Sequence, residues 1–179
     1  MKLKQVVLGS IFAAIASVAN AGLLDGKTVK FEYFYPDLSS PYYGSPNGNY
    51  VVGAGVEVSP IVDGNGALDL QSDGFTVNFG NSVGFSNGTF NGFVISDVNS
   101  TIAPFTSFTL ITNTAGGPNP TLSFDADNLY VNWQGLSYSG GELVFAVNAV
   151  PEPETYAMLL AGVGLLGFVA RRRKQALAA

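Results

Sequence analysis

Between Gly22 and Ala149 the sequence contains short runs in which apolar residues recur with a period of two, and it shows no sustained helical period. The run from Val29 to Tyr35 is an example, because its odd-numbered residues are all apolar or aromatic while Lys30 and Glu32 lie between them. Successive side chains of a strand point to opposite faces, so this alternation is typical of strands with one buried face. The sequence therefore predicts an all-β domain over residues 22–149.

Asn-Gly and Asp-Gly pairs separate the apolar runs. Asn and Asp tolerate a positive φ and Gly accepts it freely, as the tight turns of β-hairpins require. The pairs lie at positions 25–26, 47–48, 63–64, 65–66, 73–74, 87–88 and 91–92. Roughly eight or nine short strands at this spacing favour an antiparallel β-sandwich of the jelly-roll type, with a β-barrel as the alternative.

Residues 1–21 have the three-part pattern of a secretory signal peptide. Lys2 and Lys4 give a positive start, and an apolar stretch follows at positions 6–18. Small residues mark the cleavage site: Ala19, Ala21 and Gly22. The pattern implies the Sec translocon and signal peptidase as partners, and it places the β domain outside the cytoplasm. A buried N-terminal helix is the alternative.

An uncharged run of 16 residues at positions 155–170 lies near the C-terminus. As a helix it would rise about 24 Å, a little less than the ~30 Å hydrocarbon core of a membrane. Four cations close the run: Arg171, Arg172, Arg173 and Lys174. Because cytoplasmic flanks carry an excess of Lys and Arg, we expect an inner-membrane helix over 155–170 and a cytoplasmic tail at 175–179. The alternatives are a permanent anchor and a buried core helix.

The segment before this run reads Val150-Pro151-Glu152-Pro153-Glu154, and its prolines favour an extended, accessible backbone. With the Gly-rich apolar run and the cations, it resembles the PEP-CTERM sorting signal of Gram-negative bacteria over residues 150–174, a signal also labelled ice-binding protein C-terminal domain. The resemblance implies that an exosortase, a membrane cysteine transpeptidase-like enzyme, recognises Pro151, Glu152 and Pro153. Cleavage nearby would take the protein from a transient inner-membrane anchor to the cell surface or the extracellular space.

Residues 22–150 contain two basic and eleven acidic residues, which leaves a net charge of −9. This charge argues against nucleic acid as a partner and leaves neutral sugars and divalent cations. The chain has no Cys and no His, which excludes disulfides, a Ser-His-Asp triad, a Cys-His pair and a His-ligated zinc centre. Paired carboxylates could still serve a glycosidase, but nothing in the sequence selects a pair. We therefore expect no enzyme and no cofactor, with Ca²⁺ as the one exception.

Oxygen-bearing side chains recur at positions one, three and seven of a short loop, namely Asp63, Asn65 and Asp69. Calcium loops use such spacing to direct hard oxygen ligands at one ion. The loop lacks the distal Glu of those sites, since its twelfth position is Gly74. The three residues are therefore candidate Ca²⁺ ligands, and an ordinary Asx-rich hairpin is the alternative.

Aromatic residues supply candidate carbohydrate contacts, because neutral sugars need an apolar ring face next to hydrogen-bonding groups. Tyr42 and Tyr43 lie in a proline-bounded loop at positions 41–46 and are expected to be exposed. Trp133 lies between two amide residues, although its alternation with the apolar residues before it also fits a core position.

Two functions follow as hypotheses. The first is a non-enzymatic exported protein of a Gram-negative bacterium, sorted by an exosortase to the envelope or to the extracellular matrix of a biofilm. The second is a lectin-like module that binds exopolysaccharide, with or without calcium. Ice binding, which the family label suggests, needs regularly spaced threonines. The threonines of the longest polar stretch do not keep a period of two: Thr106, Thr109, Thr112 and Thr114.

Overall fold

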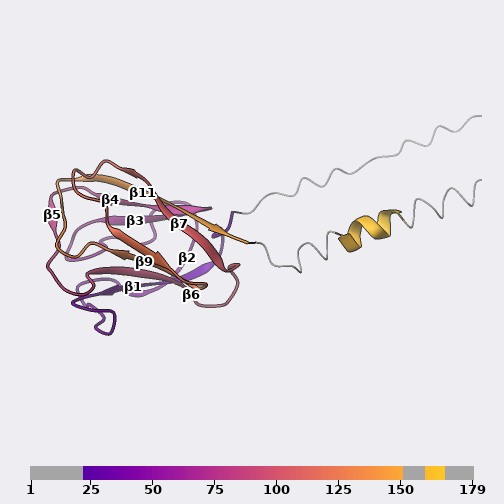
Figure 1. The fold of residues 1–179 in the computed structure, drawn as a ribbon, viewed down its shortest axis with the longest axis horizontal. Coiled ribbons are helices and arrows are strands. Elements are labelled where there is room, and N and C mark those ends of the chain that lie inside the picture. Colours follow the sequence, from indigo (N-terminus) through magenta and orange to yellow (C-terminus); the bar gives the residue numbers. More distant parts are fainter. Residues whose placement is uncertain (1–21, 151–159, 168–179) are drawn as a thin grey trace, which may run out of the picture.

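The computed structural model describes residues 22–150 and 160–167 (Figure 1). The predicted signal peptide at 1–21 lies outside the described residues. So do the predicted recognition residues Pro151, Glu152 and Pro153 and the cations at 171–174. The structural account therefore concerns the β domain and one short helix.

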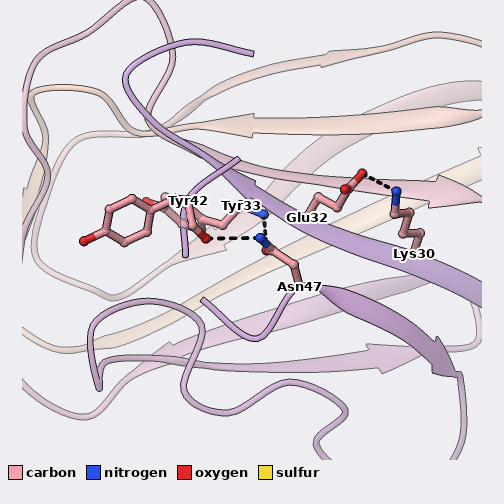
Figure 2. Close-up of polar contacts among 5 residues, drawn as sticks. All are labelled: Lys30, Glu32, Tyr33, Tyr42 and Asn47. Carbon is pink, nitrogen blue, oxygen red and sulfur yellow. Dashed lines mark hydrogen bonds and ion pairs between the residues drawn. The ribbon is translucent and has the colours of Figure 1, made fainter. Parts of the chain in front are cut away.

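Eleven strands form between residues 22 and 150. They are β1 (Thr28–Phe34), β2 (Gly48–Val51), β3 (Ala67–Gln71), β4 (Gly74–Phe79), β5 (Val83–Gly84), β6 (Gly92–Asp97), β7 (Phe105–Asn113), β8 (Thr121–Phe124), β9 (Asn128–Asn132), β10 (Ser137–Tyr138) and β11 (Gly141–Ala149). In β1 every second residue is buried, as the alternation predicts. The salt bridge from Lys30 to Glu32, with Nζ 2.9 Å from Oε2, lies on the other face of β1, where an exposed pair adds little stability (Figure 2).

The strands form two main sheets. One has the order β2-β1-β6-β9-β8, the other has the order β3-β4-β11-β7, and β5 pairs separately with β10. Every pairing is antiparallel, so the predicted all-β, antiparallel class is confirmed. The predicted jelly-roll arrangement does not agree with the observed order of strands in the sheets. A jelly roll winds one long hairpin so that the first and last strands are neighbours, whereas β1 and β11 lie in different sheets.

The two sheets form two layers and share one aromatic core (Figure 1). Phe75 of β4 and Phe93 of β6 come from different sheets, and their ring centroids are 5.9 Å apart. Phe79 of β4 packs edge-on against Trp133 at 5.6 Å, just beyond β9. Such contacts bury large apolar areas and stabilise, without disulfides, a domain that has no cysteine.

The edge strand β3 lies where the sequence suggested a calcium loop or an Asx-rich hairpin. Its residues Leu68 and Leu70 are fully buried, whereas Asp69 between them is only partly buried and pairs in register with Thr76 of β4. Because the acidic residues on both sides are typical of a loop, the short apolar alternation of β3 was hidden in the calcium-loop interpretation.

Residues 160–167 form a helix inside the predicted run at 155–170, and all of them are exposed. Within 22–150 and 160–167, no helix has the length and apolar character needed to cross a membrane. The other residues of the predicted run lie outside the described ranges.

Candidate functional site

A cleft of about 270 Å³ lies at the end of the domain that carries β5. One part of its lining is aromatic: Tyr33, Tyr35, Tyr42 and Phe85. Another part is polar: Asp63, Asn65, Ser82, Ser86 and Asn91. The cleft therefore combines ring faces with hydrogen-bonding groups, and Asp63 is the only carboxylate among its lining residues.

β1 and the loop after it bring three tyrosines to the cleft, Tyr33 from the strand and Tyr35 and Tyr42 from the loop. Tyr42 N–H donates to the carbonyl of Tyr33 at 2.8 Å, and Tyr35 N–H donates to the carbonyl of Ser40 at 3.0 Å. The ring of Tyr42 therefore lies beside both others, with centroids 6.0 Å from Tyr33 and 6.2 Å from Tyr35.

The side-chain amide of Asn47 fixes this arrangement (Figure 2). Its Oδ1 accepts from the N–H of Tyr33 at 2.8 Å, and its Nδ2 donates to the carbonyl of Tyr42 at 3.1 Å. One amide thus holds two residues that are nine positions apart, and the tyrosine side of the cleft is preorganised.

Asp63 reaches the cleft from a tight turn. Asp63 and Gly64 both have positive φ, 46° and 77°, and Val62 and Asn65 exchange backbone hydrogen bonds of 3.1 and 2.8 Å across them. Two successive positive φ values define a type I′ turn, for which Asp-Gly is a preferred pair. The turn predicted at 63–64 is confirmed. Asp63 N–H also donates to the carbonyl of Gly44 at 2.9 Å, which ties the turn to the tyrosine loop.

Tyr42 and Asp63, two candidates from separate predictions, meet in the cleft. The hydroxyl of Tyr42 lies 2.9 and 3.0 Å from the two carboxylate oxygens of Asp63. This bond, followed by partial burial, raises the pKa of Tyr42. Tyr42 therefore stays protonated at neutral pH and orients a carboxylate that keeps further lone pairs for the donors of a ligand.

The floor of the cleft is a buried polar chain. Trp133 Nε1 donates to the hydroxyl of Tyr33 at 2.8 Å, and that hydroxyl donates to Asn91 Oδ1 at 2.8 Å. Asn91 Nδ2 in turn donates to the carbonyl of Ser86 at 2.9 Å. Burial raises the pKa of Tyr33, so its hydroxyl keeps the proton that it gives to Asn91. A fully paired buried network of this kind is rigid.

The two other predicted carbohydrate contacts lie outside the cleft. Trp133 has no exposed surface, so the prediction of a stacking platform is wrong and the core alternative holds. Tyr43 is 96% exposed but does not line the cleft. Of the three aromatic candidates, Tyr42 alone lies at the site.

The three candidate calcium ligands do not lie together at the cleft. Asp63 and Asn65 line the cleft, whereas Asp69 belongs to β3 and is not among the lining residues. Among the residues that the structure describes, no group of three or more acidic side chains is placed to hold a metal ion.

The sequence prediction missed several residues of the site, among them Phe85 and Asn91. The Asn91-Gly92 pair was expected to form a turn, but Gly92 begins β6 and both residues are buried. The signal for the role of Asn91 lies 58 positions away, in the tyrosine of β1 that it contacts.

Comparison with known proteins identifies a protein-sorting motif near the C-terminus. Residues 149–174 match the family model of the PEP-CTERM protein-sorting motif, which begins at the last residue of β11. No curated protein and no solved structure matches the chain.

Proposed function

Because residues 149–174 carry a PEP-CTERM protein-sorting motif, we propose that this chain is an exported, non-enzymatic protein whose β domain an exosortase delivers to the cell envelope or the extracellular matrix. The motif itself implies export and an exosortase as the processing partner. The observation that carries the proposal is the position of the motif, which starts where the last strand of the domain ends.

The N-terminal edge of the domain supports the same proposal. Gly22, the first residue after the predicted signal cleavage, donates its N–H to Asp25 Oδ2 at 2.9 Å, and Leu24 two positions later is fully buried. Asp73 accepts hydrogen bonds from Leu23 N–H and Val147 N–H, so the start of the domain and the end of β11 are held together. Cuts before Gly22 and within 151–154 would leave this structure intact.

The acidic residues near the cleft support a role without catalysis. Glycoside hydrolysis requires two carboxyl groups on either side of the scissile bond. The cleft offers Asp63 alone, and its carboxylate is engaged by Tyr42. The cleft is therefore better suited to binding than to hydrolysis.

Expression in matched hosts with and without an exosortase tests the sorting proposal. With the enzyme, we expect the protein in the exported fraction, shortened at its C-terminus. Without it, we expect a longer form in the membrane fraction. As a control, replacing Pro151, Glu152 and Pro153 by alanine should give the longer form in both hosts. The same shortened product in both hosts would contradict the proposal.

The cleft favours a second function, binding of a neutral carbohydrate. Tyr35 and Tyr42 supply ring faces. The Asn65 amide, the Asp63 carboxylate and the exposed hydroxyls of Ser82 and Ser86 supply partners for sugar hydroxyls. The cleft lies at the end of the domain opposite the point where the chain leaves β11 towards the sorting motif (Figure 1). A domain still attached through that motif would therefore present the cleft away from its attachment.

The Tyr42→Ala variant tests the carbohydrate proposal. The exported protein should bind at least one of dextran, mannan and cello-oligosaccharides, and the variant should bind it about tenfold more weakly. An aromatic contact contributes about 0.5–1.5 kcal/mol, and tenfold corresponds to about 1.4 kcal/mol. Isothermal titration calorimetry measures the loss.

The exposed neighbour Tyr43 provides a matched control, since Tyr43→Ala should leave binding unchanged. Equal losses in the two variants would contradict a site at the cleft. EDTA should not weaken binding, because the candidate ligand Asp69 does not reach the cleft. A loss with EDTA would restore the calcium-dependent alternative.

A further inference from the structure

A second and more open cleft of about 560 Å³ adjoins the first, and Asn65 lines both. Its lining includes three other polar side chains, Ser59, Asn78 and Asn81, and no charged residue. Amide and hydroxyl groups both donate and accept hydrogen bonds, as sugar hydroxyls do. The second cleft is therefore chemically suited to the same kind of ligand as the first, without its aromatic faces.

Asn65, which lines both clefts, has a fixed backbone conformation. Gly64 and Gly66 have φ of 77° and 76° on either side of Asn65, whose N–H is held by the carbonyl of Val62 at 2.8 Å. The Asn65 amide donates through Nδ2 to the carbonyl of Asp63 at 3.1 Å, which leaves its Oδ1 for a ligand. A single fixed amide thus lies where the two clefts meet.

Three glycines, Gly64, Gly66 and Gly80, line the second cleft, and Gly64 and Gly80 have open space where a side chain would begin. A Cβ at Gly66 would press against Phe79 Cε1 at 3.0 Å, and the positive φ of 76° would strain any other residue there. Gly80 differs, because it has no atom within 4 Å of a built Cβ and no positive φ. A larger side chain at Gly80 would therefore narrow the cleft that this residue lines without a clash at its Cβ.

Building on the proposed carbohydrate function, we propose that the two clefts form one continuous path that binds a linear neutral polysaccharide along its chain, over several sugar units. The first cleft lies near the lower end of the roughly 300–1,000 Å³ typical of small-molecule sites, so it suits a short segment. The second cleft extends the contact past Asn65. The carboxylate of Asp63 and the −9 charge of residues 22–150 repel anionic chains, which restricts the path to neutral ones.

The dependence of affinity on ligand length tests this path. Calorimetry on the exported protein would compare glucose, cellobiose and cellohexaose, with the matching mannose and α-1,6-glucose series in parallel. In at least one series we expect the hexasaccharide to bind at least about tenfold more tightly than the disaccharide. Alginate, an anionic polymer, should not compete.

Three variants separate the path from the first cleft. Gly80→Leu should abolish the gain with length and leave disaccharide binding unchanged, whereas the small substitution Gly80→Ala should preserve the gain. Tyr42→Ala should weaken binding at every length. Equal affinity for all lengths, or Gly80→Leu without effect on the hexasaccharide, would overturn the path while the first cleft stands. An absence of binding in all three series would overturn the carbohydrate function and the path together.

Discussion

Tyr33→Phe is expected to lower the free energy of unfolding by about 3 kcal/mol. The substitution removes one oxygen atom that serves two buried partners, since Trp133 Nε1 loses its acceptor and Asn91 Oδ1 loses its donor. Each buried polar group left without a partner costs about 1–3 kcal/mol. Because the chain has a single tryptophan and Trp133 is in this network, its fluorescence during urea unfolding reports the change directly.

Tyr138→Phe is the matched control. Tyr138 is also buried in the aromatic core, but its hydroxyl has no hydrogen-bond partner within the described residues. Burial raises its pKa to about 12, so the hydroxyl is protonated at any pH used for the comparison. Removing it should leave stability unchanged or raise it slightly, since an unpaired buried group is lost. Equal destabilisation by the two variants would mean that the Trp133-Tyr33-Asn91 chain is not what fixes the core.

Gly92→Ala is expected to have a comparable effect, about 3 kcal/mol, by overpacking. A Cβ at Gly92 would overlap the backbone carbonyl oxygen of Val131, in the strand that pairs with β6. A backbone atom within a ladder cannot swing aside as a flexible side chain can. The pairing of β6 with β9 must therefore open, and Asn91 next to it would leave the floor of the cleft.

The control for this variant is Gly80→Ala, where the added Cβ meets no atom within 4 Å. Urea unfolding should show the control close to the parent protein and Gly92→Ala far below it. Without denaturant, Gly92→Ala should also bind carbohydrate more weakly, because Asn91 would leave the floor of the cleft. A Gly92→Ala protein as stable as the parent would contradict the close approach of β6 and β9.

Much of the fold could be predicted from local sequence because a period of two is a local property. The alternation at 29–35 gives β1, and Asp63-Gly64 gives its turn, since both depend on neighbours in the chain. Asn91-Gly92 has the same local character as a turn pair, yet both residues are buried and Gly92 pairs in register with Asn132 of β9. A dipeptide pattern does not indicate which distant strand will pair with it.

The candidate site could be predicted only in pieces for the same reason. Tyr42 and Asp63 were identified separately, one for sugar and one for calcium, and 21 positions separate the two residues that share a hydrogen bond. Trp133 and Tyr33 are 100 positions apart. The sequence contains the chemistry of the cleft, whereas the pairing of β1 with β6 and of β6 with β9 brings that chemistry together.

The central claim is that export and sorting trim this chain at the two edges of its β domain. Mass spectrometry of the protein recovered from the exported fraction, by intact mass and terminal peptides, tests it most directly. We predict an N-terminus at Gly22 and a C-terminus between Pro151 and Glu154. Exported protein that still contains residues 171–179 would contradict the claim and would indicate a permanent anchor.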